Sequence, residues 1–155
     1  MDEIKNILFI CTGNTARSPA AEYLAKYYMN EYGLNLHIES AGFINAFSYM
    51  QPLSKRYLDK YNIDYIGFSP QIVNRELVQK NDLIITMETS HKHQLFNEFG
   101  NIKVLKNKTF TLKEFTGDLE NHDIIDPYYT SDEEYRKILG IIDKHVERLI
   151  KILKE

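Results

Sequence analysis

The sequence predicts an α/β fold, a four-stranded parallel sheet with helices on both faces. Short apolar segments alternate with amphipathic segments along the 155 residues, and no repeat, low-complexity stretch or linker interrupts them. Strands that alternate with helices form parallel sheets through right-handed crossovers. We therefore expect a single domain over residues 1–155, with its ligand site at the carboxyl ends of the strands.

Four apolar or alternating runs are the predicted strands. They are Asn6–Ile10, Leu36–Ser40, Asp82–Met87 and a weaker run, Lys103–Leu105. Each is short and rich in aliphatic residues, which is typical of strands buried in a parallel sheet. The first run ends one residue before Cys11, so we expect this thiol at the carboxyl end of its strand.

Five segments have the spacing of helices. The expected helices are Pro19–Tyr32, Pro52–Tyr61, Asn74–Lys80, Thr89–Phe99 and the segment that follows Ser131. Ser18 is the expected N-cap of the first helix, because proline is favoured at the first helical position. Ser131 and Glu134 have the spacing of a capping box. The apolar face behind that box comprises Tyr135, Ile138, Leu139, Ile142, Val146, Leu149, Ile150 and Leu153.

Composition and charge exclude several classes of protein. The chain is 43% hydrophobic and 26% charged, and its net charge of -3 argues against nonspecific binding to nucleic acid or to an anionic membrane. The single cysteine allows no internal disulfide and no metal-ligand pattern. His91 and His93 fall on different helix faces, so we expect them at the surface rather than at a metal. We expect a cytoplasmic monomer without metal or cofactor.

The loop CTGNTARSP, from Cys11 to Pro19, combines the features of an anion-binding loop. Amides that converge before a helix N-terminus attract an anion, and the helix dipole adds about half a positive charge. Glycine lets the backbone curl closely, and asparagine tolerates a left-handed conformation. The loop lacks both common nucleotide-binding patterns. The expected phosphate-binding residues are Thr12, Gly13, Asn14, Thr15, Ala16, Arg17 and Ser18.

Cys11 and Arg17 give this loop its chemistry. The amides and the dipole stabilise a thiolate on Cys11, which is the nucleophilic form of cysteine. Arg17 can bind two phosphoryl oxygens as a planar fork. Ser18 can donate a hydrogen bond to the sulfur. A lone cysteine at a strand end is usually a small buried hydrophobe, but the Cys-x5-Arg spacing between strand and helix favours a nucleophile.

The tetrapeptide Asp126-Pro127-Tyr128-Tyr129 supplies a candidate for the acid that such chemistry needs. A leaving group of high basicity departs poorly without a proton. Pro127 restricts Asp126 to an extended conformation, which holds its carboxylate on a fixed loop. The two tyrosines can wall the mouth of the pocket. Asp-Pro alone is a common turn element, and the interpretation depends on its pairing with the cysteine loop.

CTGNTARSP near the N-terminus, together with DPYY near the C-terminus, resembles the low-molecular-weight protein-tyrosine-phosphatase family over essentially the whole chain. The resemblance implies Cys11 as nucleophile, Arg17 as phosphate clamp and Asp126 as general acid and then base. It also implies that Asn14 and Ser18 shape the loop and that Ser40 supports it. The reaction expected from this resemblance is a double displacement through a phosphocysteine, on a phosphorylated protein.

The residues that select the substrate give two conflicting signals. Thr15 stands where tyrosine-directed members carry isoleucine, and it resembles the protein-arginine-phosphatase branch, as do the stretches 91–93 and 111–115. Tyr128 and Tyr129 instead resemble the tyrosine-directed members. We favour phosphoarginine, with phosphotyrosine as the alternative. The aromatic wall of tyrosine-directed members has no direct match, and Phe43, Phe47 and Tyr49 are the candidates to replace it.

Three other functions are alternatives to a phosphatase, and the role of Glu88 is open. Arsenate reductases share the architecture, but the thioredoxin-coupled type needs further cysteines, and Ala16 stands where many family members carry a second one. A cysteine phosphocarrier domain needs no general acid, and a phosphoresidue-binding module needs no nucleophile. Glu88, at the end of a predicted strand, either orients the catalytic loop or is a solvated carboxylate.

Overall fold

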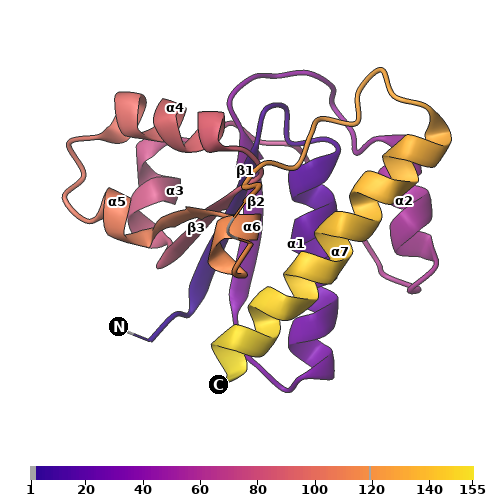
Figure 1. The fold of residues 1–155 in the computed structure, drawn as a ribbon, viewed down its shortest axis with the longest axis horizontal. Coiled ribbons are helices and arrows are strands. Elements are labelled where there is room, and N and C mark those ends of the chain that lie inside the picture. Colours follow the sequence, from indigo (N-terminus) through magenta and orange to yellow (C-terminus); the bar gives the residue numbers. More distant parts are fainter. Residues whose placement is uncertain (1–2, 119) are drawn as a thin grey trace.

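The computed structural model describes residues 3–118 and 120–155, which form a sheet between two sets of helices (Figure 1). The elements in chain order are β1 (Asn6–Cys11), α1 (Arg17–Glu31), β2 (His37–Gly42), α2 (Pro52–Asp59), α3 (Arg75–Lys80), β3 (Leu83–Thr86), α4 (Thr89–Phe99), α5 (Leu105–Lys108), β4 (Thr109–Thr111), α6 (Leu112–Phe115) and α7 (Asp132–Lys154). Among the described residues, no helix is both long and apolar enough to cross a membrane.

The sheet has four parallel strands in the order β2-β1-β3-β4, which confirms the predicted fold class. In its centre, Phe9 of β1 pairs with Ser40 of β2 on one side and with Ile85 of β3 on the other. Each of the first three strands is followed by a crossover connection that leads to the start of the next strand, as parallel strands require. The carboxyl ends of β1, β2 and β3 therefore meet at one edge.

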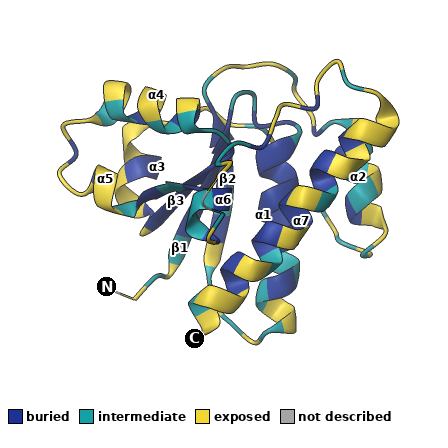
Figure 2. Ribbon diagram, viewed as in Figure 1, coloured by how far each residue is buried: buried dark blue, intermediate teal, exposed yellow. Residues whose placement is uncertain are grey.

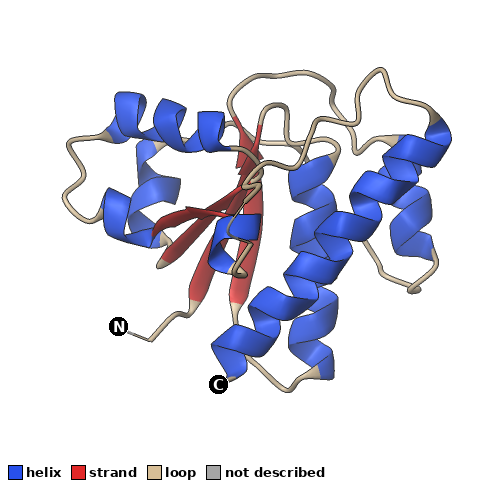
Figure 3. Cartoon of the chain, in the orientation of Figure 1, coloured by secondary structure: helices blue, strands red, loops and turns tan. Residues whose placement is uncertain are grey.

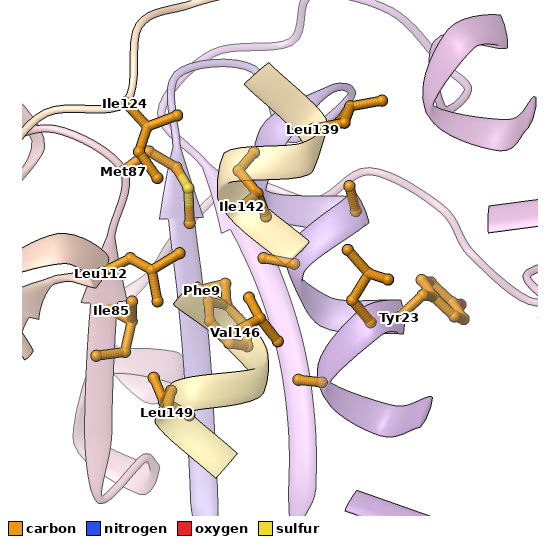
Figure 4. Packing of buried hydrophobic residues seen from close by; sticks show 14 of the residues in the cluster. Phe9, Tyr23, Ile85, Met87, Leu112, Ile124, Leu139, Ile142, Val146 and Leu149 are labelled. Atoms are coloured by element: carbon orange, nitrogen blue, oxygen red, sulfur yellow. The ribbon is translucent and has the colours of Figure 1, made fainter. Parts of the chain in front are cut away.

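Alternate side chains of β1 supply two separate hydrophobic cores. Ile7 and Phe9 point to the face covered by α1 and α7, whereas Leu8 and Ile10 point to the face covered by α3 and α4. All four are fully buried. Figure 2 shows the buried sheet between helices whose outer faces are exposed, and Figure 4 shows Phe9 packed beside Val146 of α7. Burial on both faces explains why this strand is a continuous apolar run.

The prediction for the fourth strand is wrong. It was expected at Lys103–Leu105, but β4 is Thr109–Thr111, and Leu105 begins the short helix α5. Leu105 is buried in the core with α3 and α4, whereas Val104 is 54% exposed, so this run packs as a helical turn. The sequence Thr-Phe-Thr of β4 has the β-branched and aromatic residues that strands favour, yet three residues are too few for a clear pattern.

The start of α1 also differs from the prediction. The helix begins at Arg17, and its N-cap is Ala16, which offers no side-chain cap, rather than Ser18. The Ser18 hydroxyl instead faces Cys11 across the loop. At the start of α7, the Ser131 hydroxyl accepts a hydrogen bond from the Glu134 backbone N–H at 3.1 Å, which is the half of the predicted capping box that forms in the described part of the chain.

Three loops meet at the carboxyl edge of the sheet (Figure 3). They are the loop between β1 and α1, the segment 43–51 between β2 and α2, and the segment that leads into α7. The C-terminus and the beginning of β1 lie at the opposite end of the molecule (Figure 1). The fold therefore brings CTGNTARSP and DPYY to the same edge.

Candidate active site

The loop after β1 is shaped by backbone contacts with the segment 43–51. The Thr12 carbonyl accepts hydrogen bonds from the N–H groups of Phe43 and Ile44 at 2.7 and 3.1 Å, and the Thr15 carbonyl accepts one from Gln51 at 2.8 Å. Asn14 adopts a left-handed conformation with φ of 54°. Carbonyls that are bound to the neighbouring segment cannot point into the loop, and a left-handed residue beside right-handed ones makes an anion-binding concavity.

Gly42, at the end of β2, allows this loop to lie directly against the sheet. A Cβ atom at this position would lie 2.7 Å from the Asn14 nitrogen and 2.8 Å from the Thr12 oxygen. Both of these are backbone atoms, so the loop itself would have to move to make room. The close approach requires glycine here.

Cys11 is buried, with 3% of its surface exposed, and two groups approach its sulfur. The Sγ atom lies 2.9 Å from Ser18 Oγ, and the Asn14 backbone N–H points to it at 3.3 Å. The Asn14 side-chain amide already donates to Ser18 Oγ at 2.9 Å. The serine hydroxyl must therefore direct its own hydrogen to the sulfur, so that both contacts place a hydrogen-bond donor at Sγ.

The same asparagine links the loop to β2 and α1. Its amide nitrogen also donates to Ser40 Oγ at 2.8 Å, and its side-chain oxygen accepts from the Gln71 backbone N–H at 3.0 Å. Ser40 in turn donates to Glu22 Oε1 at 2.6 Å. Asn14, Ser18 and Ser40 are all at most 2% exposed. These residues form the floor of the loop rather than the wall of the pocket.

Arg17 is the most buried cation of the site, with 1% of its surface exposed. Its Nη1 donates to Glu88 Oε2 at 2.5 Å and to the Ile124 carbonyl at 2.7 Å. Nη2 lies 3.8 Å from Asp126 Oδ2, and Nε is buried without a hydrogen-bond partner among the described residues. Glu88 is therefore a partner of the loop arginine, and one edge of the guanidinium remains available for a ligand.

Asp126 lies on a loop that is tied to the carboxyl edge of the sheet. The Ile124 N–H donates to the Met87 carbonyl at 2.9 Å, and Asp123 Oδ1 accepts from the Thr89 N–H at 2.7 Å. The carboxylate itself is half exposed, and its Oδ1 accepts from the Tyr128 N–H at 3.0 Å. The Asp126 carboxyl thus lies at the boundary between the buried guanidinium and solvent.

These groups line a pocket of about 270 Å³. The residues expected from the sequence that line it are Cys11, Thr12, Gly13, Thr15, Ala16, Arg17, Phe47, Asp126 and Tyr128. Phe47 is thus the aromatic residue of the segment 43–49 that reaches the pocket. Tyr49 and Tyr129 lie outside the lining, with ring centroids 5.8 Å from Phe47 and 4.2 Å from Tyr128 respectively. Four lining residues were not anticipated: Ile44, Ala46, Gln51 and Tyr135.

His91 is a second position where the prediction is wrong, because it is buried rather than at the surface, whereas His93 is exposed. Its Nδ1 accepts from the Glu88 N–H at 3.1 Å, so its proton lies on Nε2, which donates to Thr12 Oγ1 at 3.1 Å. Burial, and after it the nearby Arg17 charge, lower the pKa of His91 to about 4. The ring is neutral and braces the loop from the α4 side.

The side chains of Cys11, Arg17 and Asp126 thus lie around one pocket beside the loop after β1. This pocket is at the carboxyl edge of the parallel sheet, where such folds bind ligands. This arrangement is of a suitable size and chemistry for a phosphate group beside the cysteine. The sequence pattern of the family described as low molecular weight phosphotyrosine protein phosphatase matches residues 6–155. The chain belongs to this family of protein phosphatases.

The chain is also similar in sequence and structure to individual members of the family. The chain is 34% identical to a protein-arginine-phosphatase of Bacillus subtilis over 152 residues, which are 97% of each chain. It is 36% identical to the low molecular weight protein-tyrosine-phosphatase PtpB of Staphylococcus aureus over 83% of this chain and 85% of that one. The crystal structure of a mutant of YwlE from Bacillus subtilis superimposes with a TM-score of 0.88 and 31% identity, over 97% of this chain and 99% of that one.

Proposed function

We propose that this protein removes phosphate from phosphoarginine in proteins, through a phosphocysteine at Cys11. The observation that carries the proposal is the free edge of Arg17: among the described residues its buried Nε has no partner, and its Nη2 reaches only Asp126, at 3.8 Å. Two parallel N–H groups on one edge match two phosphoryl oxygens. They lie in the same pocket as the Cys11 sulfur.

In the first step, the Cys11 thiolate attacks phosphorus in line with the leaving group. The S–P bond forms while the bond from phosphorus to the guanidino nitrogen breaks, and Asp126 transfers its carboxyl proton to that nitrogen. Arg17 and the loop amides hold the three equatorial oxygens as negative charge builds on them. The products are an unmodified arginine and a phosphocysteine.

In the second step, water hydrolyses the phosphocysteine. The Asp126 carboxylate accepts a proton from the water as its oxygen attacks phosphorus, and the P–S bond breaks to release phosphate. The Ser18 hydroxyl, 2.9 Å from the sulfur, stabilises the departing thiolate by a hydrogen bond. The enzyme returns to its starting state, with the proton on Asp126 and the charge on Cys11.

Thr15 supports phosphoarginine as the substrate. It lines the pocket and is 5% exposed, and in this proposal its hydroxyl contacts the leaving group. A hydroxyl can accept a hydrogen bond from a guanidinium, which a phenol ring does not offer. Phe47 and Tyr128, whose rings are 6.0 Å apart, form an aromatic wall, and a planar guanidinium stacks on aromatic faces as well as a phenol does. The relative named as a protein-arginine-phosphatase adds to this support.

The proposal is tested by phosphate release from a phosphoarginine peptide and a phosphotyrosine peptide of the same sequence context, with Cys11→Ser as the blank. We expect kcat/KM to favour phosphoarginine. Thr15→Ile should lower kcat/KM for phosphoarginine by about tenfold or more while sparing phosphotyrosine, because a site that loses a hydrogen-bonding group discriminates less.

Other outcomes would contradict the proposal. A wild-type preference for phosphotyrosine would assign the tyrosine-directed activity. Retention of one phosphate per chain without turnover would instead indicate a phosphocarrier. The monomeric state and the cytoplasmic location stay predictions, and a lone free thiol is in keeping with a reducing compartment.

A further inference from the structure

A second, smaller hollow of about 130 Å³ lies between α2 and α7, outside the catalytic pocket. We call it the α2–α7 groove, and it is lined by Leu53, Arg56, Tyr57, Lys60 and Arg136. The first four of these are spaced three, one and three residues apart, so they form one stripe along α2 and its C-cap residue, Lys60. Arg136 closes the groove from the first turns of α7.

The floor of the groove is fixed. The Tyr57 hydroxyl donates to Asp143 Oδ2 of α7 at 2.7 Å, and this contact holds its ring between the two helices. Lys60 Nζ lies 5.1 Å from the centre of the same ring. Leu53 and Tyr57 give the groove an apolar base, and the charged groups surround it.

Its three cations have no ionic partner in the described part of the chain. None of the ion pairs or side-chain hydrogen bonds within residues 3–118 and 120–155 involves Arg56, Lys60 or Arg136. Of the residues that the structure places, no carboxylate lines the groove. The protein as a whole carries a net charge of -3, so this cluster of positive charge is opposite in sign to the net charge.

The groove lies next to the catalytic pocket. Gln51 and Tyr135 line the pocket, whereas Leu53 and Arg136, their near neighbours in sequence, line the groove. The two helices are joined between the hollows by Ser54 Oγ and the Tyr135 hydroxyl, 2.7 Å apart. A polypeptide that leaves the pocket on this side passes over α2 and α7, and each of its residues spans about 3.4 Å.

We propose that the α2–α7 groove binds acidic side chains of the protein substrate, close in sequence to the phosphorylated residue. Three unpaired cations complement two or three carboxylates, and the Leu53–Tyr57 base accommodates their methylene stems. The groove then acts on affinity and on the rate of encounter, whereas Cys11, Arg17 and Asp126 act on the phosphoryl group. This proposal rests on the proposed function, because it assumes a phosphoprotein substrate.

The test compares two phosphoarginine peptides that carry either glutamates or glutamines about two to four residues from the phosphoarginine on both sides. We expect the wild-type enzyme to prefer the glutamate peptide in kcat/KM by about tenfold at low salt, and the preference to fade at about 0.5 M salt. Arg56→Gln/Lys60→Gln should reduce this preference by about threefold to tenfold. Turnover of a small aryl phosphate should not change in this variant.

Lys103→Gln/Lys106→Gln is the matched control, because it removes the same charge on the α5 side and also includes a lysine next to an aromatic ring, Lys106 at 5.8 Å from Phe96. It should keep the wild-type preference. A wild-type enzyme that treats both peptides alike, or an equal loss in the control, would overturn the proposal. The dissociation constants of both peptides, measured in the Cys11→Ser background, decide this question independently of turnover. Failure to hydrolyse any phosphopeptide or aryl phosphate would contradict the proposed function alone.

Discussion

Helix α1 carries a buried polar cluster near each of its ends. Near its N-terminal end, Ser18 and Glu22 join Asn14 and Ser40 beneath the Cys11 loop. In its second half, Tyr28 donates to Asp143 of α7 at 2.5 Å, and Asp143 also accepts from Tyr57 and Tyr61. The loop cluster and the Asp143 carboxylate are buried, whereas Tyr57 and Tyr61 are half-buried. Each cluster connects segments that are distant in the sequence.

The two clusters differ in whether all of their polar groups have hydrogen-bond partners. Three tyrosine hydroxyls surround the Asp143 carboxylate, so that cluster is complete and holds α1, α2 and α7 together. The loop cluster is complete on its inner side only. Toward the pocket it presents the Cys11 sulfur and the free edge of Arg17. Complete polar clusters stabilise packing, whereas an incomplete one that faces a pocket is organised for a ligand.

The largest effect that separates the two clusters is expected for Asn14→Ala. Alanine removes the hydrogen bonds to Ser18 and Ser40 and is strained at φ of 54°. Displacement of the loop should lower kcat/KM by about 10²-fold. Asn14→Gly is the control, because glycine adopts this φ without strain but also lacks the side-chain hydrogen bonds to Ser18 and Ser40. Its kcat/KM should also fall by more than about tenfold, and a near-wild-type rate would show that the network does not position the loop.

Asp143→Asn should have the opposite profile. The amide cannot accept from all three hydroxyls with the strength of a carboxylate, and hydrogen bonds to a charged group contribute about 1.5–3 kcal/mol each. We expect the free energy of unfolding, measured in urea, to fall by about 3 kcal/mol while kcat/KM stays within about twofold. A large loss of activity at unchanged stability would mean that this cluster also serves the pocket.

The smallest effect is the pH dependence of stability. Because burial lowers the pKa of His91 from 6.5 to about 4, the folded state resists a proton that the unfolded state accepts. This contribution is complete above pH 6.5 and is lost as pH falls toward 4, and it amounts to about 1–2 kcal/mol between pH 7 and 5. Burial also lowers the pKa of His145, which adds in the same direction. His91→Asn should flatten this acid limb in urea titrations, and an unchanged limb would contradict the assignment.

The meeting of the two motifs at one pocket could be predicted from the sequence, but the residues around them could not. Cys11, Arg17 and Asp126 have neighbours that restrict them locally, a glycine loop and a proline, so short motifs identify them. His91 and Tyr135 reach the site through the packing of α4 and α7, and nothing in their local sequence distinguishes them from ordinary helix residues.

The same distinction applies to the fold. β1 and β3 are apolar runs buried on both faces, and the pattern predicts them. β4 has three residues, and only its pairing with β3 makes it a strand. Ser18 is a residue type that often caps helices and it precedes a proline, so the local pattern predicts an N-cap. In the structure its hydroxyl instead contacts the sulfur of Cys11. Long-range contacts therefore decided the elements that local pattern left short or ambiguous.

The most direct test of the account is to identify the atom that carries the phosphoryl group during turnover. Asp126→Asn slows the hydrolysis of the intermediate, by about 10²–10⁴-fold if Asp126 is the general base. After this variant is mixed with an aryl phosphate and quenched in acid, mass spectrometry should find one phosphoryl group on the peptide that contains Cys11. The double variant with Cys11→Ser tests whether the cysteine is required for turnover. Continued turnover without Cys11, or a phosphoryl group on another residue, would contradict the account.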